Sequence, residues 1–147
     1  MKYRVLCIGR RARDPLLDAA DDYLARLQHY CGTTLVRLRE GSMASEAEEL
    51  LGRITPRDHV VLLDERGKQH STYDLHGRVT AWQASGLKEV AFVIGGADGL
   101  HPNVKGRAQE QWALSRLTLP HRFAQVLLLE QLYRVHTLLR GEGYHRP

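Results

Sequence analysis

Apolar and polar positions follow two periods that alternate along the chain. Apolar runs typical of strands cover residues 3–9, 33–39, 59–64, 89–94 and 112–114. Apolar residues at helical spacing cover residues 15–27, 45–53, 71–86, 102–111 and 123–140. This alternation predicts an α/β fold with three layers around a mainly parallel sheet. Because no repeat or linker interrupts the pattern, we expect a single domain over residues 1–147.

Local signals mark the start of one helix and the end of one strand. Ser71 followed by Asp74 resembles a capping box, which predicts a helix start. Gly67 and Lys68 interrupt the apolar run 59–64, so we expect that strand to end before them.

Three loops with unusual chemistry follow the expected strands, at residues 64–68, 95–99 and 115–121. Parallel α/β sheets bind ligands at the carboxyl ends of their strands, which is where these loops would lie. Gly95 and Gly96 would let the backbone approach a ligand or adopt positive φ, and a plain glycine turn is the alternative.

The loop LSRLTLPH, residues 114–121, is apolar for a surface connection, with leucines on both sides of its hydroxyl residues. Such a loop could line a pocket for an adenine ring and hold the ring with backbone N–H and C=O groups. A buried crossing that resembles a β-hairpin is the alternative.

The composition is that of a globular protein, with 43% hydrophobic and 26% charged residues. No run of about 18 apolar residues is present, so no membrane span is expected. The first strand begins at once, so no secretory signal is expected either. Cys7 and Cys31 form no CxxC pair, which favours buried thiols in a reducing compartment over a disulfide or a zinc site. We therefore expect a cytoplasmic protein with no metal and no membrane partner.

The net charge of +4 comes entirely from the last third of the sequence. Residues 1–100 hold fourteen basic and fourteen acidic side chains, and residues 101–147 hold seven and three. Most of the basic residues are arginines, whose planar guanidinium suits phosphate recognition. A second basic cluster, at Arg10, Arg11 and Arg13, follows the first strand. Both clusters suit RNA phosphates, and an ordinary solvated surface is the alternative.

Several common site motifs are absent. Gly95, Gly96 and Gly99 have the wrong spacing for GxGxxG and follow the fourth strand, not the first. Gly67 and Lys68 lack the rest of a P-loop. The sequence has neither an HxxxH pair nor a GxSxG motif. These absences disfavour dinucleotide, ATP, zinc-hydrolase and serine-hydrolase sites.

A series of short motifs occurs in a fixed order along the sequence. The motifs are VLLD (61–64) with Gly67-Lys68, FVIGG (92–96) with Gly99-Leu100, LSRLTLPH (114–121), VLLLEQLYR (126–134) and the terminal YHR (144–146). This ordered set resembles the ribosomal RNA large-subunit methyltransferase H family, a minimal branch of the SPOUT (α/β-knot) methyltransferases. The resemblance covers essentially the whole sequence, and the ordered set is more specific than any one motif.

The resemblance implies a fold and an activity. The fold would include a C-terminal trefoil knot that holds S-adenosylmethionine, and the enzyme would act as a homodimer. The activity would be methylation of N3 of pseudouridine 1915 in helix 69 of 23S rRNA.

The resemblance also implies which residues form the site. The cofactor residues would be Leu63, Gly95, Gly96, Leu114, Ser115, Arg116, Leu117, Thr118, Leu119 and Pro120. The catalytic residues would be His121, His145 and Arg146, and the RNA-binding residues would be Arg10, Arg122, Tyr144, His145 and Arg146. The tail that carries Tyr144, His145 and Arg146 would reach the pocket of the partner subunit.

Two points stay open at the level of sequence. Either His121 or His145 could assist loss of the imide proton, because an unperturbed imidazole titrates near neutral pH.

Competing functions are a SPOUT methyltransferase that acts on tRNA and a non-catalytic RNA-binding protein of ribosome assembly. A small-molecule oxidoreductase is disfavoured by the placement of the glycines.

Overall fold

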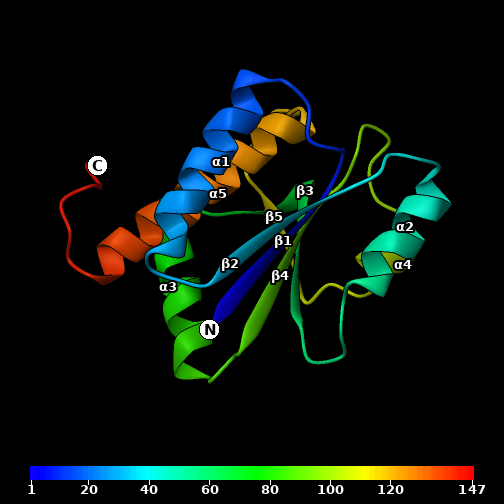
Figure 1. Cartoon of the computed structure of the whole chain (residues 1–147). Helices are drawn as coiled ribbons and strands as arrows, with labels where there is room; N and C mark the ends of the chain where they lie inside the picture. Colours follow the sequence, from blue (N-terminus) through cyan, green and yellow to red (C-terminus); the bar gives the residue numbers. More distant parts are fainter.

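The computed structural model describes residues 1–147, with five strands and five helices in strict alternation. The strands are β1 (Lys2–Ile8), β2 (Thr33–Leu38), β3 (His59–Gln69), β4 (Glu89–Ile94) and β5 (Glu110–Ala113). The helices are α1 (Pro15–Gln28), α2 (Met43–Gly52), α3 (Thr72–Ala84), α4 (Pro102–Lys105) and α5 (His121–Leu139). Neighbouring strands are all parallel, in the order β2-β1-β4-β3-β5. Helices α1, α3 and α5 cover one face of the sheet, and α2 and α4 cover the other (Figure 1). The predicted three-layer α/β fold is therefore confirmed.

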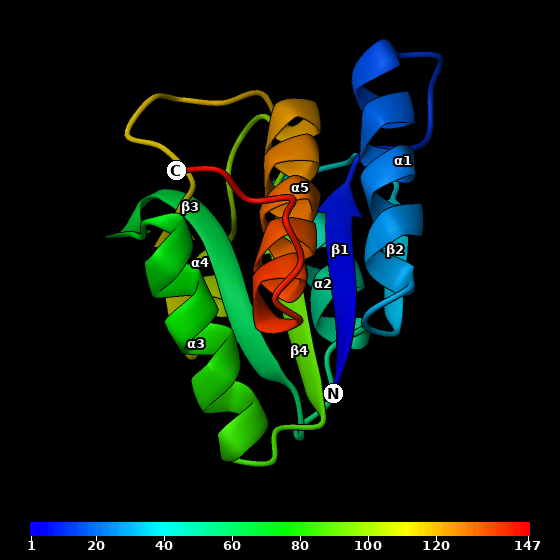
Figure 2. The same cartoon turned by 90° about the vertical axis from the view of Figure 1, so that its left-hand side faces the viewer.

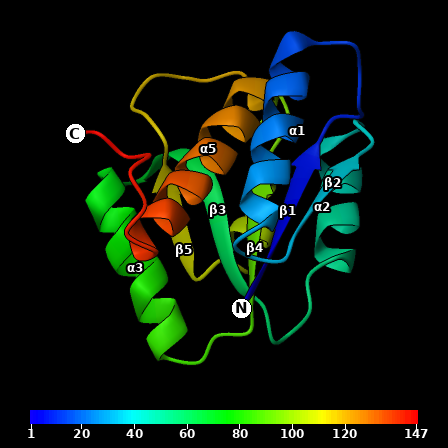
Figure 3. The ribbon, with the colours of Figure 1, turned by 60° about the vertical axis from the view of Figure 1, so that its left-hand side comes forward.

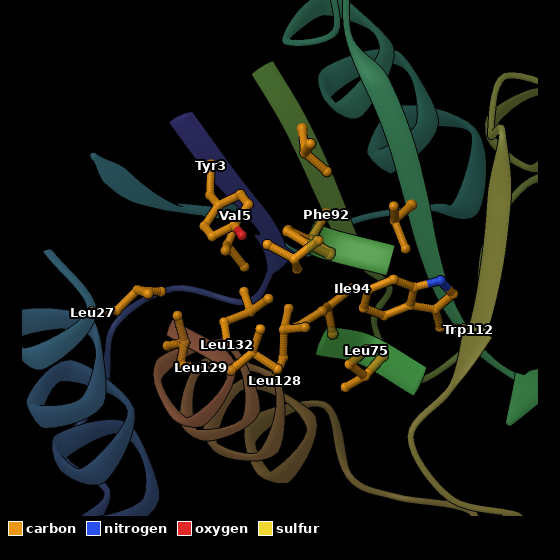
Figure 4. Packing of buried hydrophobic residues seen from close by; sticks show 14 of the residues in the cluster. Tyr3, Val5, Leu27, Leu75, Phe92, Ile94, Trp112, Leu128, Leu129 and Leu132 are labelled. Carbon is orange, nitrogen blue, oxygen red and sulfur yellow. The ribbon is translucent and has the colours of Figure 1, made fainter. Parts of the chain in front are cut away.

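Side chains alternate between two buried clusters, one on each face of the sheet. Along β1, Val5 and Cys7 belong to the cluster beneath α1, α3 and α5, whereas Leu6 and Ile8 belong to the cluster beneath α2 and α4. Figure 4 shows the first cluster, in which residues of α5 lie against side chains of the central strands. Because both faces are covered, the central strands are apolar at nearly every position.

Two tryptophans lie inside the first cluster. Trp82 and Trp112 stack with ring centroids 5.6 Å apart and an angle of 4° between the rings.

The capping box of α3 is confirmed, because the Ser71 hydroxyl accepts from the Asp74 N–H and the Asp74 carboxylate accepts from the Ser71 N–H.

Strand β3 is longer than the sequence predicted. It continues to Gln69 through a bulge, so that both Leu63 and Lys68 lie opposite Trp112 of β5. A Cβ on Gly67 would lie 2.6 Å from the backbone carbonyl carbon and oxygen of Gln111. The absence of a side chain at Gly67 therefore lets the backbones approach, and the prediction that the strand ends before it is wrong.

Helix α4 is shorter than the predicted helix over residues 102–111 and ends at Lys105. Gln109 instead bonds to β3, donating its N–H to the Val60 carbonyl (2.9 Å) and accepting the Val60 N–H with Oε1 (2.6 Å). Pairing with the sheet thus overrides the helical pattern, and β5 begins at Glu110. After β5 and the loop that follows it, α5 begins at His121, two residues earlier than predicted.

Both cysteines are buried free thiols, as expected. Burial raises the pKa of the Cys7 thiol to about 12. None of the helices has the length and the apolar character needed to cross a membrane. The trefoil knot implied by the resemblance stays a prediction.

Candidate functional site

A cavity of about 740 Å³ lies at the carboxyl ends of β3, β4 and β5. Its wall contains residues from all three segments that the sequence analysis expected as loops. They are 64–66, which lie at the bulge inside β3 and not in a loop, 95–99, and 115 with 117–121. Figure 3 shows the segment between β5 and α5 arching beyond the end of the sheet. Cavities of this size are typical of small-molecule and cofactor sites, so this is the candidate binding site.

Most of the predicted cofactor residues meet in this wall. The predicted residues that line the cavity are Leu63, Gly95, Gly96, Leu114, Ser115, Leu117, Thr118, Leu119, Pro120 and His121. Arg116 is the exception, because its side chain is exposed and does not line the cavity. A charged side chain on this mostly apolar loop stays in water. The place of Arg116 among the cofactor residues therefore stays a prediction from the resemblance.

The loop between β5 and α5 is tied to the bulge of β3. The Ser115 hydroxyl accepts from the Leu117 N–H (2.9 Å), which forms a tight turn. The Thr118 hydroxyl donates to Oε2 of Glu65 (2.6 Å) and so links this loop to the bulge of β3. Leu117 is 72% exposed, which does not fit the alternative of a buried hairpin-like crossing.

The glycines of the second loop make room for protein atoms. A Cβ on Gly95 would lie 2.7 Å from Cγ of Leu100, and one on Gly96 would lie 3.0 Å from Cγ2 of Ile8. Neither glycine has a positive φ, whereas Gly99 does (+81°) and donates its N–H to the Gly96 carbonyl (3.1 Å). The structure therefore supports the alternative of a tight glycine turn, packed onto Leu100 and Ile8.

The cavity wall also carries an ion pair that the sequence analysis did not single out. Nζ of Lys105 lies 3.6 Å from Oδ2 of Asp64, whose side chain is 15% exposed. Met43 of α2 and Ala124 of α5 line the cavity as well. No local pattern marks Lys105, Met43 or Ala124, because only the packing of three helices brings them to the end of the sheet.

His121 lies where the cavity meets the turn after β1. Gly9 has φ +121°, and a Cβ there would lie 3.0 Å from Nε2 of His121 and 3.4 Å from Oε1 of Glu40. Arg10 follows Gly9 and is exposed. Gly9 lies against His121, so the predicted RNA-binding Arg10 is the neighbour in sequence of a residue that packs on the cavity wall.

Arg122 is held by an ion pair within the protein. Its Nη1 lies 2.6 Å from Oδ2 of Asp14, and the hydrogen bond from Arg122 lowers the pKa of the Asp14 carboxyl. Asp14 also caps α1 by accepting the Leu16 N–H with Oδ1 (2.8 Å). Arg122 thus joins the start of α5 to the start of α1.

The C-terminal tail folds back along α5 (Figure 2), and none of its residues lines the cavity of its own subunit. The Tyr144 hydroxyl donates to Oε1 of Glu130 (3.1 Å), and burial is the main cause of the raised pKa of Tyr144. Nδ1 of His145 lies 3.2 Å from Nη1 of Arg134, and Arg146 is exposed. Of the predicted catalytic residues, His121 alone lines the cavity.

Comparisons with known proteins agree with this arrangement. A family model described as "Predicted SPOUT methyltransferase" matches residues 1–145. A ribosomal RNA large subunit methyltransferase H from Anaeromyxobacter dehalogenans is 43% identical over 99% of this chain and 100% of its own length. One from Polynucleobacter asymbioticus is 40% identical over 99% of each chain.

A weaker likeness connects the protein to a solved structure, the SpoU methyltransferase AviRb of Streptomyces viridochromogenes in complex with the cofactor AdoMet. That likeness has 14% identity and a TM-score of 0.49, covers 90% of this chain and 57% of the other, and adds nothing to the family match. The match of the family model and the near full-length relatives together show that the chain belongs to the SPOUT methyltransferases and, among them, to the ribosomal RNA large subunit methyltransferase H family.

Proposed function

We propose that this protein is an S-adenosylmethionine-dependent 23S rRNA methyltransferase that methylates N3 of pseudouridine 1915 in helix 69. Family membership over nearly the whole sequence supports this activity. The observation that carries it is the cavity in which the three motif-bearing segments meet.

The cavity fits such a cofactor in size and chemistry. Leu63, Leu114 and Leu119 supply apolar walls for a base, and the Asp64–Lys105 pair supplies charges of both signs. When bound, S-adenosylmethionine supplies an activated methyl group. The wall residues would bind and orient it, and orientation accounts for much of the rate of an in-line displacement.

The imide N3–H of the target base must lose its proton in this reaction. His121 lines the cavity and sits at its edge beside Gly9, so its imidazole can reach a base placed at the cavity mouth. We propose that His121 assists this proton loss. His145, the other histidine that the sequence indicates for this role, does not line this cavity.

The RNA backbone would be held by exposed arginines. Arg10 and Arg146 are exposed, whereas Arg122 is paired with Asp14 and would contribute less. Tyr144 and His145 would contact the RNA as part of the same tail.

We propose a homodimer, because the tail and the cavity of one subunit are apart. A second copy could place its Tyr144, His145 and Arg146 at this cavity. The proposed location is the cytoplasm.

The proposal is tested by mass mapping of 23S rRNA from a strain that lacks this protein, with and without the purified enzyme. We expect the loss of one methyl group on the helix 69 fragment and its return on addition of the enzyme. An unchanged fragment refutes the rRNA target, and a methyl group lost from tRNA instead supports the tRNA alternative.

Calorimetry with S-adenosylmethionine separates an enzyme from an assembly protein, because the latter needs no cofactor. A variant truncated after Gly143 should bind the cofactor like the full-length protein and should not methylate ribosomes. Methylation by the truncated variant would contradict the role of the tail.

A further inference from the structure

The C-terminal tail is held by one buried carboxylate. Glu130 of α5 accepts hydrogen bonds at Oε1 from Nε (2.9 Å) and Nη2 (2.6 Å) of Arg134 and from the Tyr144 hydroxyl (3.1 Å). Its side chain is 13% exposed. A doubly bonded arginine and a tyrosine on one carboxylate oxygen form a charge-assisted anchor with a defined geometry.

The other oxygen of Glu130 connects this anchor to α3. Oε2 accepts from Nε2 of Gln131 (2.7 Å), and Oε1 of Gln131 accepts from the Thr72 hydroxyl (2.7 Å). Tyr73, the next residue of α3, packs against His145 with ring centroids 5.2 Å apart at 90°. Side chains of α3 and α5 therefore contact the tail from two sides.

Arg134 determines which nitrogen of His145 carries the proton. Nη1 of Arg134 lies 3.2 Å from Nδ1 of His145, and a guanidinium can only donate hydrogen bonds. Nδ1 must therefore accept, so the ring proton is on Nε2. Nε2 is buried without a hydrogen-bond partner within this subunit. An unpaired buried donor costs about 1–3 kcal/mol, which an acceptor on a ligand would recover once a covering side chain moves aside.

We infer that Glu130 and Arg134 are positioning residues that fix His145 as a neutral imidazole with its proton on Nε2. In this state Nε2 of His145 donates a hydrogen bond to a carbonyl oxygen of the target base, which requires a covering side chain to move first, because Nε2 has no exposed surface. It cannot take the imide proton, because the Nδ1 lone pair is already occupied by the Arg134 N–H. The inference rests on the proposed function, and it leaves His121 as the histidine available to accept the proton.

The first test reads the tautomer directly. In the full-length protein labelled with ¹⁵N-histidine, NMR should show the His145 Nε2 protonated and Nδ1 unprotonated near neutral pH, with His145→Gln used to assign the signals. In Arg134→Met this preference should be lost. A proton on Nδ1 in the wild type overturns the inference, whether or not the protein methylates RNA.

The second test compares two carboxylates of the same region. Glu130→Gln removes the charged anchor, whereas Glu142→Gln changes an exposed carboxylate that accepts from the Tyr30 hydroxyl (2.5 Å) and is hydrogen-bonded to neither Tyr144 nor His145. We expect Glu130→Gln to lower kcat for methylation at least tenfold with an unchanged Kd for S-adenosylmethionine. Glu142→Gln should match the wild type.

Wild-type kcat in Glu130→Gln overturns the positioning role. An equal loss in both variants also overturns it, because the effect would then not depend on the anchor. Arg134→Lys keeps the charge but cannot make both bonds to Glu130, so it should recover only part of the activity lost in Arg134→Met. If the wild type itself fails to methylate RNA, the proposed function fails, and the tautomer measurement still decides the inference.

Discussion

Glu110, the first residue of β5, accepts hydrogen bonds from four side chains. Oε2 bonds to Nε2 of His59 (2.6 Å), Nη2 of Arg78 (2.6 Å) and Nε1 of Trp82 (3.1 Å). Oε1 bonds to Nε of Arg78 (3.0 Å) and Nε1 of Trp112 (3.0 Å). This cluster anchors the strand that leads into the cavity's apolar loop. We predict that Glu110→Gln destabilises the fold strongly near neutral pH.

The size of the effect follows from the pKa of this carboxyl. Burial raises the pKa of Glu110, but the hydrogen bonds from Arg78, His59 and Trp112 outweigh burial and lower it from 4.5 to about 2. At about 1.4 kcal/mol per pH unit, this difference corresponds to about 3 kcal/mol. Because the folded pKa is the lower one, the stabilisation is complete above about pH 4.5 and is lost as the pH falls towards 2.

Urea denaturation of wild type and Glu110→Gln at pH 7 and at pH 3 measures this directly. We expect a difference in unfolding free energy of about 3 kcal/mol at pH 7 that shrinks markedly at pH 3. Glu89→Gln is the control. The Glu89 side chain is 44% exposed, and its Oε2 lies 3.5 Å from Nε of Arg4. Loss of this exposed ion pair should lower the unfolding free energy by less than about 1 kcal/mol. A difference that is equal at both pH values, or absent at pH 7, refutes the reasoning.

Three further outcomes are expected. Gly67→Ala should lower stability by about 1–3 kcal/mol in thermal denaturation, because its Cβ would press on the backbone of β5; an unchanged Tm would contradict this. Thr118→Val removes the bond to Glu65 between the cavity loop and the bulge of β3, and calorimetry should show Kd for S-adenosylmethionine raised about fivefold, consistent with about 1 kcal/mol. Arg146→Ala should reduce the log–log salt slope of RNA binding by about one, and Arg122→Ala by less because Arg122 is paired with Asp14.

The sequence predicted the layers of the fold and the place of the cavity for one reason. Strands buried on both faces are recognisable as apolar runs, and loops at their carboxyl ends must meet at one edge of the sheet. β4 accordingly has the bounds expected from sequence, Glu89–Ile94. The long α5 was also expected, because its apolar positions continue over several turns.

The errors have a common physical cause, which is contact between segments distant in sequence. The strand β3 does not end before Gly67, because β5 pairs with β3 on both sides of its bulge. Gln109 bonds to β3 where its local pattern favours a helix. Lys105 reaches the cavity by the docking of a helix, and the tail is held by Glu130, a residue that the sequence marked only as part of a helical motif. None of these contacts leaves a periodic signal.

The buried thiol of Cys7 gives the protein a built-in reporter of global opening. It lies in β1, an interior strand of the sheet, with no exposed surface, and reaction with an alkylating or disulfide reagent requires the thiolate. Labelling of Cys7 should therefore wait until the sheet itself comes apart. The rate of its modification in mild denaturant would time that event without any added fluorophore.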